Sequence, residues 1–238
     1  MSAIRAIASL MVGVSLMFDA WGFVLPNQNP QDVLILVNKQ NRAPIVPMTL
    51  VRPNVTPTKE GYEENIYMRP EAASALEELF DGASEAGLTL YATSGFRSYS
   101  TQKAIWERKL EKMSEASANK SVAKPGYSEH QTGLAMDLEG ETTKNTGLTE
   151  AFGNSPEGIW VAEHCHEYGF IIRYQQGTTD ITGYIYEPWH IRYVGREAAQ
   201  EIVDLGVTFE EYILMVRKGR VVEVSRPPQQ GEATMDEM

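Results

Sequence analysis

Two short stretches of the chain combine imidazole and carboxylate side chains at a spacing that favours metal chemistry. The first lies within Tyr127 to Asp137 and reads Ser-x-His-x-x-Gly-x-Ala-x-Asp, with His130 and Asp137 seven residues apart. Because that separation exceeds one helical turn, we expect His130 on a loop and a short inward-running strand from Leu134 to Leu138. Asp137 then lies on the strand face opposite the apolar side chains. A carboxylate flanked by core residues needs a partner, usually a metal ion or an arginine.

The second stretch, Glu187-Pro188-Trp189-His190, adds another carboxylate and another histidine. Pro188 disfavours helical geometry at Glu187, so this is not the helical His-Glu-x-x-His arrangement. Residues three apart in an ideal strand point to opposite faces, so we predict a turn or bulge that brings Glu187 and His190 to one site. Two histidines and one carboxylate suit zinc with its fourth position open for water. The remaining Glu187 would accept a proton from that water and pass it to the leaving group.

Several side chains outside these two stretches could also take part in catalysis or metal binding. Arg97 offers a fixed cation for a substrate carboxylate or a developing oxyanion. The run His164-Cys165-His166 contains metal-ligand types, but consecutive helical residues point about 100° apart and cannot converge on one ion unaided. We interpret that run as part of a helix face. Arg173 and Arg192, with their tyrosine neighbours, are interpreted as structural strand residues, and Trp189 as a pocket wall or a packing residue.

The chain resembles the VanY-type D-alanyl-D-alanine carboxypeptidases in three blocks, which are Ser94-Gly95-Phe96-Arg97-Ser98-Tyr99-x-x-Gln102, Ser128-x-His130-x6-Asp137 and Glu187-Pro188-Trp189-His190. The blocks occur in this order, and the resemblance covers roughly residues 33 to 217. It implies the α+β fold of this zinc peptidase group. We therefore expect a single compact domain with a central antiparallel sheet, helices flanking it and a zinc site at the sheet.

The resemblance also implies a role for each motif residue. It implies a zinc ion held by three side chains, His130, Asp137 and His190. It implies Glu187 as the catalytic base, supported by Arg97. It implies peptide contacts from three side chains, Arg97, Gln102 and Ser128. The implied substrate is a peptidoglycan stem peptide, either a muropeptide or its lipid-linked precursor, that ends in D-alanine.

Several alternatives stay open. The motifs fix the hydrolytic machinery but not the residues that measure peptide length or stereochemistry. An L,D-carboxypeptidase, a D,D-dipeptidase or an endopeptidase would therefore carry the same motifs. A cell-wall binding module without turnover would keep the pocket, although the complete ligand set with Glu187 argues against it. Manganese or iron could occupy a mixed nitrogen and oxygen site in vitro.

The surrounding sequence predicts the elements that hold these residues. Helices are predicted over four segments, which are Glu71 to Ala86 after Pro70, Thr101 to Met113 after a cap at Ser98 or Ser100, Pro156 to about Gly169, and Arg196 to Leu205. Thr208 begins a capping box for a further helix. Strands are predicted over five segments, which are Val33 to Val37, Leu88 to Ala92, Phe170 to Tyr174, Gly183 to Tyr186 and Val221 to Val224. Ser114 to Ser121 is predicted to be a mobile loop, and Ile105 and Leu110 to face inward.

Composition and the chain ends bear on partners and location. The formal charge of −11 and the pI near 4.9 argue against nucleic acid as a partner.

We expect residues 1–25 to be a signal peptide or N-terminal anchor, because Ala6 to Phe18 is uncharged and mostly apolar but shorter than the roughly 20 residues of a spanning helix. An ordinary buried helix is the alternative. The zinc carboxypeptidase domain would occupy 26–224 and a disordered tail 225–238, in an exported, secreted or membrane-anchored protein of the cell envelope. The single cysteine, Cys165, forbids an intrachain disulfide.

Overall fold

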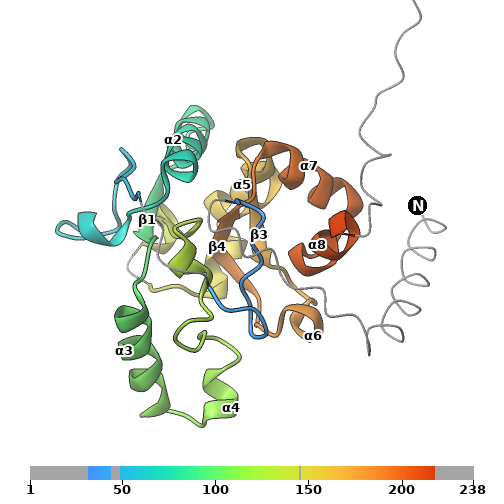
Figure 1. Ribbon diagram of the computed structural model, residues 1–238. Coiled ribbons are helices and arrows are strands. Elements are labelled where there is room, and N and C mark those ends of the chain that lie inside the picture. The colour runs from blue at the N-terminus through green and yellow to red at the C-terminus, as the bar shows by residue number, and fades with distance from the viewer. Residues whose placement is uncertain (1–31, 44–48, 145, 218–238) are drawn as a thin grey trace, which may run out of the picture.

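The computed structural model describes residues 32–43, 49–144 and 146–217. The predicted signal or anchor, the strand predicted from Val221 to Val224 and the tail all lie outside the described residues. Within the described ranges, no helix is long and apolar enough to cross a membrane. These residues fold into an α+β domain around one central sheet (Figure 1).

The sheet has four strands in the order β1-β2-β4-β3. They are β1 (Leu90–Ser94), β2 (Ala135–Gly140), β4 (Glu187–Tyr193) and β3 (Phe170–Tyr174), and every neighbouring pair is antiparallel. The alternation predicted for the central strand is confirmed, because Leu134, Met136 and Leu138 enter the main apolar core. Asp137 therefore projects from the other face of the sheet.

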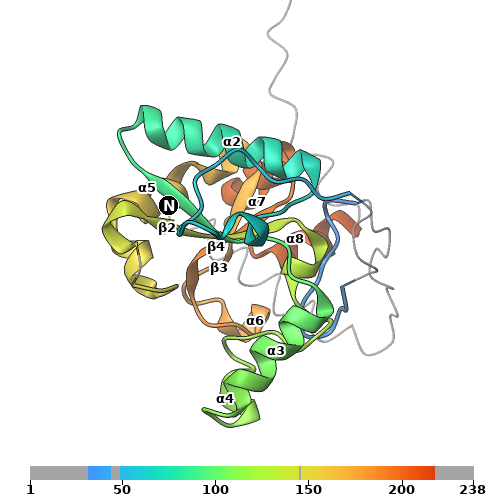
Figure 2. The ribbon, with the colours of Figure 1, turned by 90° about the vertical axis from the view of Figure 1, so that its left-hand side faces the viewer.

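Helices cover the apolar face and the far edge of this sheet. α2 (Pro70–Glu85) and α5 (Pro156–His164) supply Leu76, Leu79 and Val161 to the main core. α7 (Arg196–Leu205) and α8 (Phe209–Arg217) form a second apolar cluster with Ile171 of β3. α3 (Tyr99–Leu110), α4 (Glu115–Ala118) and α6 (Thr179–Thr182) lie at the end of the domain away from α2 (Figures 1 and 2). The 3-10 helices are η1 (Glu63–Asn65), η2 (Glu129–Thr132), η3 (Glu141–Thr143), η4 (Glu150–Asn154) and η5 (Cys165–Tyr168).

Local signals account for where the helices begin. Pro70 occupies the first turn of α2, where its missing N–H costs no helical hydrogen bond. Ser98 caps α3 by accepting from the amide of Thr101. The capping box before α8 is confirmed, because Thr208 and Glu211 exchange side-chain to backbone hydrogen bonds of 2.9 and 3.3 Å.

Four local predictions were wrong. The run Val33 to Val37 is no strand, although residues 35–37 are buried. Part of the loop predicted at Ser114 to Ser121 is α4, which Ser114 caps. The partner of β3 begins at Glu187, and residues 183–186, which follow the helical turn α6, form no strand. Leu110 is 38% exposed at the end of α3, where a short helix has already left the core.

The core packing makes a quantitative prediction for α2. Leu76 is fully buried, so Leu76→Ala should lower the free energy of unfolding by about 2–5 kcal/mol through lost apolar contacts and a cavity. Leu110→Ala is the matched control and should change it by less than about 0.5 kcal/mol. Urea unfolding followed by circular dichroism measures both. Equal losses in the two variants would contradict this placement of the core.

Candidate active site

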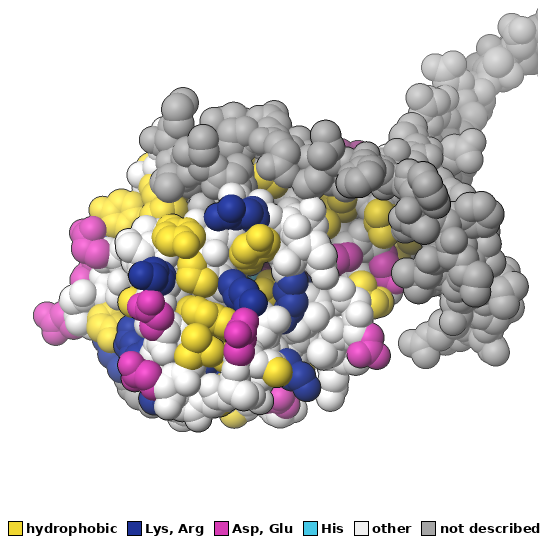
Figure 3. Space-filling model, turned by 60° about the horizontal axis from the view of Figure 1, so that its bottom comes forward, with side chains coloured by type: hydrophobic (Ala, Val, Ile, Leu, Met, Phe, Trp, Pro, Cys, Tyr) yellow, Lys and Arg dark blue, Asp and Glu magenta, His cyan; other side chains and the backbone are white. Residues whose placement is uncertain are grey.

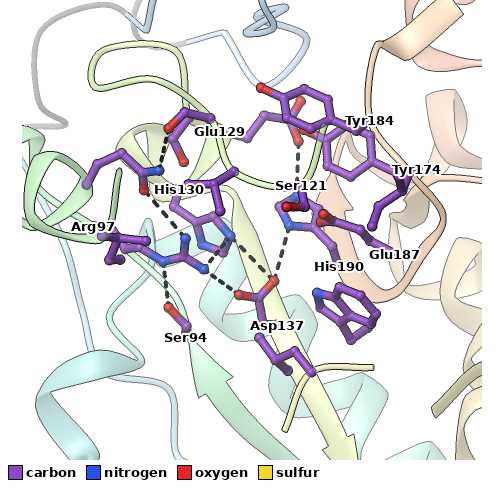
Figure 4. A pocket seen from close by; sticks show the side chains of 18 of the residues that line it. Ser94, Arg97, Ser121, Glu129, His130, Asp137, Tyr174, Tyr184, Glu187 and His190 are labelled. Carbon is purple, nitrogen blue, oxygen red and sulfur yellow. Dashed lines mark hydrogen bonds and ion pairs between the residues drawn. The ribbon is translucent and has the colours of Figure 1, made fainter. Parts of the chain in front are cut away.

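Three metal-ligand side chains from distant parts of the chain converge on the open face of the sheet (Figure 4). His130 comes from η2, Asp137 from β2 and His190 from β4, where it lies opposite Asp137 in the strand register. Asp137 Oδ1 is 3.1 Å from His190 Nδ1 and 3.4 Å from His130 Nε2. One ligand atom from each residue lies within 4.8 Å of the other two.

The two separations measured from Asp137 Oδ1 are close to those between the ligands of a tetrahedral metal. Zinc bonds of about 2.0–2.2 Å place neighbouring ligand atoms about 3.3–3.6 Å apart at tetrahedral angles. Two imidazoles and one carboxylate form a donor set that zinc uses in catalytic sites, and all three side chains are buried here. The donor types and the two spacings at Asp137 therefore fit zinc.

Two glycines of the motifs let the backbone place His130. Gly133 ends η2 with a φ of 70°, and a Cβ there would lie 2.8 Å from Leu50. The carbonyl of Gly95 is 2.8 Å from His130 Nδ1, and a Cβ on Gly95 would lie 2.5 Å from the carbonyl oxygen of Tyr67. Because a carbonyl only accepts, the hydrogen-bond network assigns the proton to Nδ1 of His130. Its Nε2 lone pair then faces the site.

Arg97 lies beside the same side chains. Its Nη2 donates to Asp137 Oδ2 and, over 3.0 Å, to His130 Nε2, while its Nε donates to Ser94 Oγ over 2.8 Å. Burial acts to raise the pKa of Asp137, but its electrostatic interactions and hydrogen bonds with His130 and Arg97 outweigh burial and hold that pKa well below its usual range. A metal ion and Arg97 would need the same lone pair of His130. The guanidinium must therefore release this imidazole before a metal can bind it.

Burial also perturbs the second histidine. Desolvation acts to lower the pKa of His190, but hydrogen bonds to Asp137 and Glu129 overcome it and raise the pKa to about 9. Imidazole binds metals in its neutral form, so a metal has to displace a proton from His190. The electrostatic environment of this histidine is thus one that favours a cation, whether proton or metal.

Glu187 lies in the same cleft but outside the group of three possible ligands. It opens β4, where the register against β3 shifts between Ile172 and Tyr174. This irregularity confirms the bulge that the spacing of Glu187 and His190 predicted. Burial raises the pKa of Glu187 to about 7, with a further contribution from Asp137. A carboxyl group that titrates near neutrality can both accept and release a proton.

A cleft of about 450 Å³ runs past these side chains. Among the residues predicted to contact a peptide or to wall the pocket, Arg97, Gln102, Ser128 and Trp189 line it. Gln102 is buried and donates from Nε2 to the carbonyl of Ala123 over 2.8 Å, so it ties α3 to the opposite wall. Seen from the side of α3, α4 and α6, the surface mixes hydrophobic side chains with charged side chains of both signs (Figure 3).

The second candidate for a metal site lies elsewhere. His164 ends α5, and its Nδ1 is 2.9 Å from Glu167. Cys165 is buried in the main core, where burial raises the pKa of its thiol to about 12. Neither these two nor His166 lines the cleft. Their positions agree with the interpretation of this run as helical residues without a shared ion.

Sequence reasoning missed a buried acid beside the site. Glu129 has its Oε2 3.3 Å from His190 Nε2, while Arg173 and Arg192 both donate to its Oε1 over 2.8 Å. Burial acts to raise the pKa of Glu129, but the two arginines hold it below its usual range. The one available signal is the position of Glu129 next to His130. Nothing in the local pattern connects it with two arginines on strands far along the chain.

Comparisons with known proteins agree with this geometry. The family model VanY, described as D-alanyl-D-alanine carboxypeptidase, matches residues 65–196. The chain is 47% identical over 195 residues to a putative carboxypeptidase, YodJ, of Bacillus subtilis (strain 168), covering 80% of this chain and 70% of that protein.

Two solved structures are similar in both sequence and fold. The first is the structure of the LdcB LD-carboxypeptidase, which was described for its recognition of peptidoglycan. It shares 47% identity with this chain at a TM-score of 0.74, and the match covers 79% of this chain and 88% of the other. A mutant of the vancomycin-resistance D,D-pentapeptidase VanY from a VanB-type cassette, in complex with Zn(II), shares 34% identity at a TM-score of 0.62. That match covers 76% of this chain and 98% of the other.

The convergence of the three donors predicts the effect of removing one. His190→Ala should lose bound zinc, because two protein ligands hold this ion far more weakly than three. Inductively coupled plasma mass spectrometry of the dialysed protein measures zinc per chain. His164→Ala is the matched control and should keep the wild-type zinc content. A wild-type zinc content in the His190 variant would contradict the site.

Proposed function

The chain belongs to the VanY family of D-alanyl-D-alanine carboxypeptidases, and from this premise we propose that it is zinc-dependent and removes the C-terminal D-alanine from peptidoglycan stem peptides or their precursors. One observation carries the proposal. The ligand atoms of two imidazoles and one carboxylate lie within 4.8 Å of one another, and a second carboxyl group with a raised pKa lies in the same cleft. This pairing of a metal-binding set with a proton carrier is what peptide hydrolysis by a metal requires.

The proposed zinc ligands are His130 through Nε2, Asp137 through Oδ1 and His190 through Nδ1. A zinc ion bound there would polarise the scissile carbonyl and lower the pKa of a water molecule. The protein's part is to keep the three donors fixed. Burial of all three limits their exchange with water and holds the site in one arrangement.

Glu187 is the proposed general base. Its pKa of about 7 leaves it able to take the proton of the attacking water and then protonate the leaving amine. The same carboxyl group thus serves both half-reactions without any other proton donor. Its place at the bulged start of β4 directs it into the cleft beside His190 (Figure 4).

Arg97, Ser128 and Gln102 are the proposed peptide contacts. Arg97 is partly open to the cleft and presents a planar guanidinium that suits the substrate's terminal carboxylate or the developing oxyanion. Ser128 lines the cleft directly before the turn that carries His130. Gln102 contributes mainly through its bond to Ala123, which fixes the wall that a peptide would meet.

A second candidate activity is L,D-carboxypeptidase, which would release the last residue of a tetrapeptide stem. The observation that favours it is the likeness to the LdcB LD-carboxypeptidase, at 47% identity and a TM-score of 0.74. A likeness to the D,D-dipeptidase VanXYg, at 32% identity and a TM-score of 0.65, supports the dipeptidase alternative, and endopeptidase activity rests on the shared motifs. We propose an extracytoplasmic role for the protein, with residues 26–224 as the catalytic domain and residues 1–25 as an export signal or anchor.

The role of Glu187 predicts a separation of metal binding from turnover. Glu187→Gln should keep zinc, because it alters no proposed ligand, but should lower kcat by about 10²- to 10⁴-fold through loss of the base. Zinc content and stem-peptide hydrolysis are measured on the same sample. Glu163→Gln, an exposed glutamate of α5, is the control and should keep wild-type turnover. Wild-type turnover in the Glu187 variant would refute the role of this residue.

Product analysis separates the candidate activities. Defined tetrapeptide and pentapeptide stems are incubated with the protein, and the products are weighed by mass spectrometry with and without a chelator. Loss of one D-alanine from the pentapeptide alone supports the D,D-activity, and shortening of the tetrapeptide supports the L,D-activity. Both should stop with the chelator. Failure of the zinc-loaded protein to cleave any stem would overturn the enzyme proposal and favour a binding module.

A further inference from the structure

Glu129 is a buried carboxylate that contacts three side chains of β3 and β4. It is the first residue of η2, next to His130, and its side chain is fully buried. Its Oε1 accepts from Arg173 Nε and from Arg192 Nη1, each over 2.8 Å. Its Oε2 is left facing His190 Nε2 at 3.3 Å. One oxygen therefore anchors the carboxylate, and the other contacts a proposed metal ligand.

Each of the two arginines also donates hydrogen bonds to groups other than Glu129. Arg173 donates from both terminal nitrogens to Glu210 of α8, over 2.8 and 2.6 Å. Arg192 donates from Nη2 to the carbonyls of Val33 and Ile35, over 2.8 and 2.7 Å. Two acids and two arginines balance in charge, as buried ions must. The carboxylate of Glu129 consequently has little freedom to move away from His190.

This arrangement determines which nitrogen of His190 carries the proton when a metal is bound. A neutral imidazole has one N–H donor and one lone pair. The carboxylate of Glu129 can only accept, so it takes the N–H at Nε2 and leaves the lone pair at Nδ1. Nδ1 is the nitrogen that faces Asp137 Oδ1 at 3.1 Å. A carboxylate behind a metal-binding histidine orients the ring and makes it a stronger ligand.

We propose that Glu129 is a positioning residue for the metal centre, which fixes the tautomer and ring orientation of His190 so that Nδ1 faces the zinc ion. The inference rests on the proposed zinc site and adds to it. In this proposal Glu129 lines the cleft but acts through His190 and is not itself a ligand of the ion. The buried cluster of Glu129, Arg173, Arg192 and Glu210 supplies the rigidity.

The competing explanation is that this cluster only holds β3, β4 and α8 together. Two matched variants separate the explanations, because each replaces one carboxylate of the same cluster by an amide. In Glu129→Gln, the arginines retain the oxygen, so the NH₂ group faces His190 Nε2. That nitrogen must then accept, which moves the ring proton to Nδ1. Glu210→Gln removes an equal charge beside Arg173 but leaves the partner of His190 intact.

Competition with a chromophoric chelator measures zinc affinity in the wild type and both variants, and urea unfolding measures their stability. Glu129→Gln should bind zinc about 10- to 100-fold more weakly than wild type. Glu210→Gln should lose stability but keep wild-type zinc affinity. Unchanged affinity in Glu129→Gln, or an equal loss in Glu210→Gln, would overturn the positioning role.

Histidine nitrogen NMR of the zinc-loaded wild type tests the tautomer without any variant, should Glu129→Gln fail to fold. We expect a protonated Nε2 and a metal-bound Nδ1 for His190, and metal binding through Nε2 for His130. A metal-bound Nε2 on His190 would overturn the inference. If the wild-type protein binds zinc and cleaves stem peptides but these tests fail, only the positioning role of Glu129 is refuted. Wild-type protein that binds no zinc refutes both the proposed function and this inference.

Discussion

The antiparallel pairing of β2 with β4 fixes the geometry of the whole site. It sets Asp137 opposite His190, although 53 residues separate them in the chain. A slip of one residue would turn every side chain of β2 to the other face. It would drive Asp137 into the apolar core and expose Met136, at the cost of an unpaired buried carboxylate. Core packing on one face of the sheet therefore maintains the spacing of the donors on the other.

The site also depends on buried charges that stabilise the fold little. Breaking a buried ion pair is costly, but a complete pair often contributes no more than an apolar pair of the same size. The arrangement of Glu129, Arg173 and Arg192 is better explained by the position it gives to His190. Groups fixed in advance need no reorganisation when charge develops during a reaction. The buried charged side chains beneath the cleft thus contribute more to the position of His190 than to the stability of the fold.

The sequence predicted what depends on neighbours in the chain. Periodicity and caps located α2 and α8, and the types and spacing of four motif residues led to the group that the structure brings together in one cleft. Contacts between segments far apart in the chain could not be predicted from the sequence pattern. Val33 to Val37 has strand composition, yet its carbonyls accept from the guanidinium of Arg192 instead of pairing with a strand. Glu129 escaped notice for the same reason, since its partners lie 44 and 63 residues away.

The central claim is that one zinc ion lies between His130, Asp137 and His190. A crystal structure of the zinc-loaded protein, with anomalous data on both sides of the zinc absorption edge, tests it most directly. The account predicts a single strong peak within about 2.0–2.2 Å of His130 Nε2, Asp137 Oδ1 and His190 Nδ1, with Arg97 withdrawn from the imidazole. A zinc peak bound by other side chains, or active crystals without a peak at these three atoms, would contradict it.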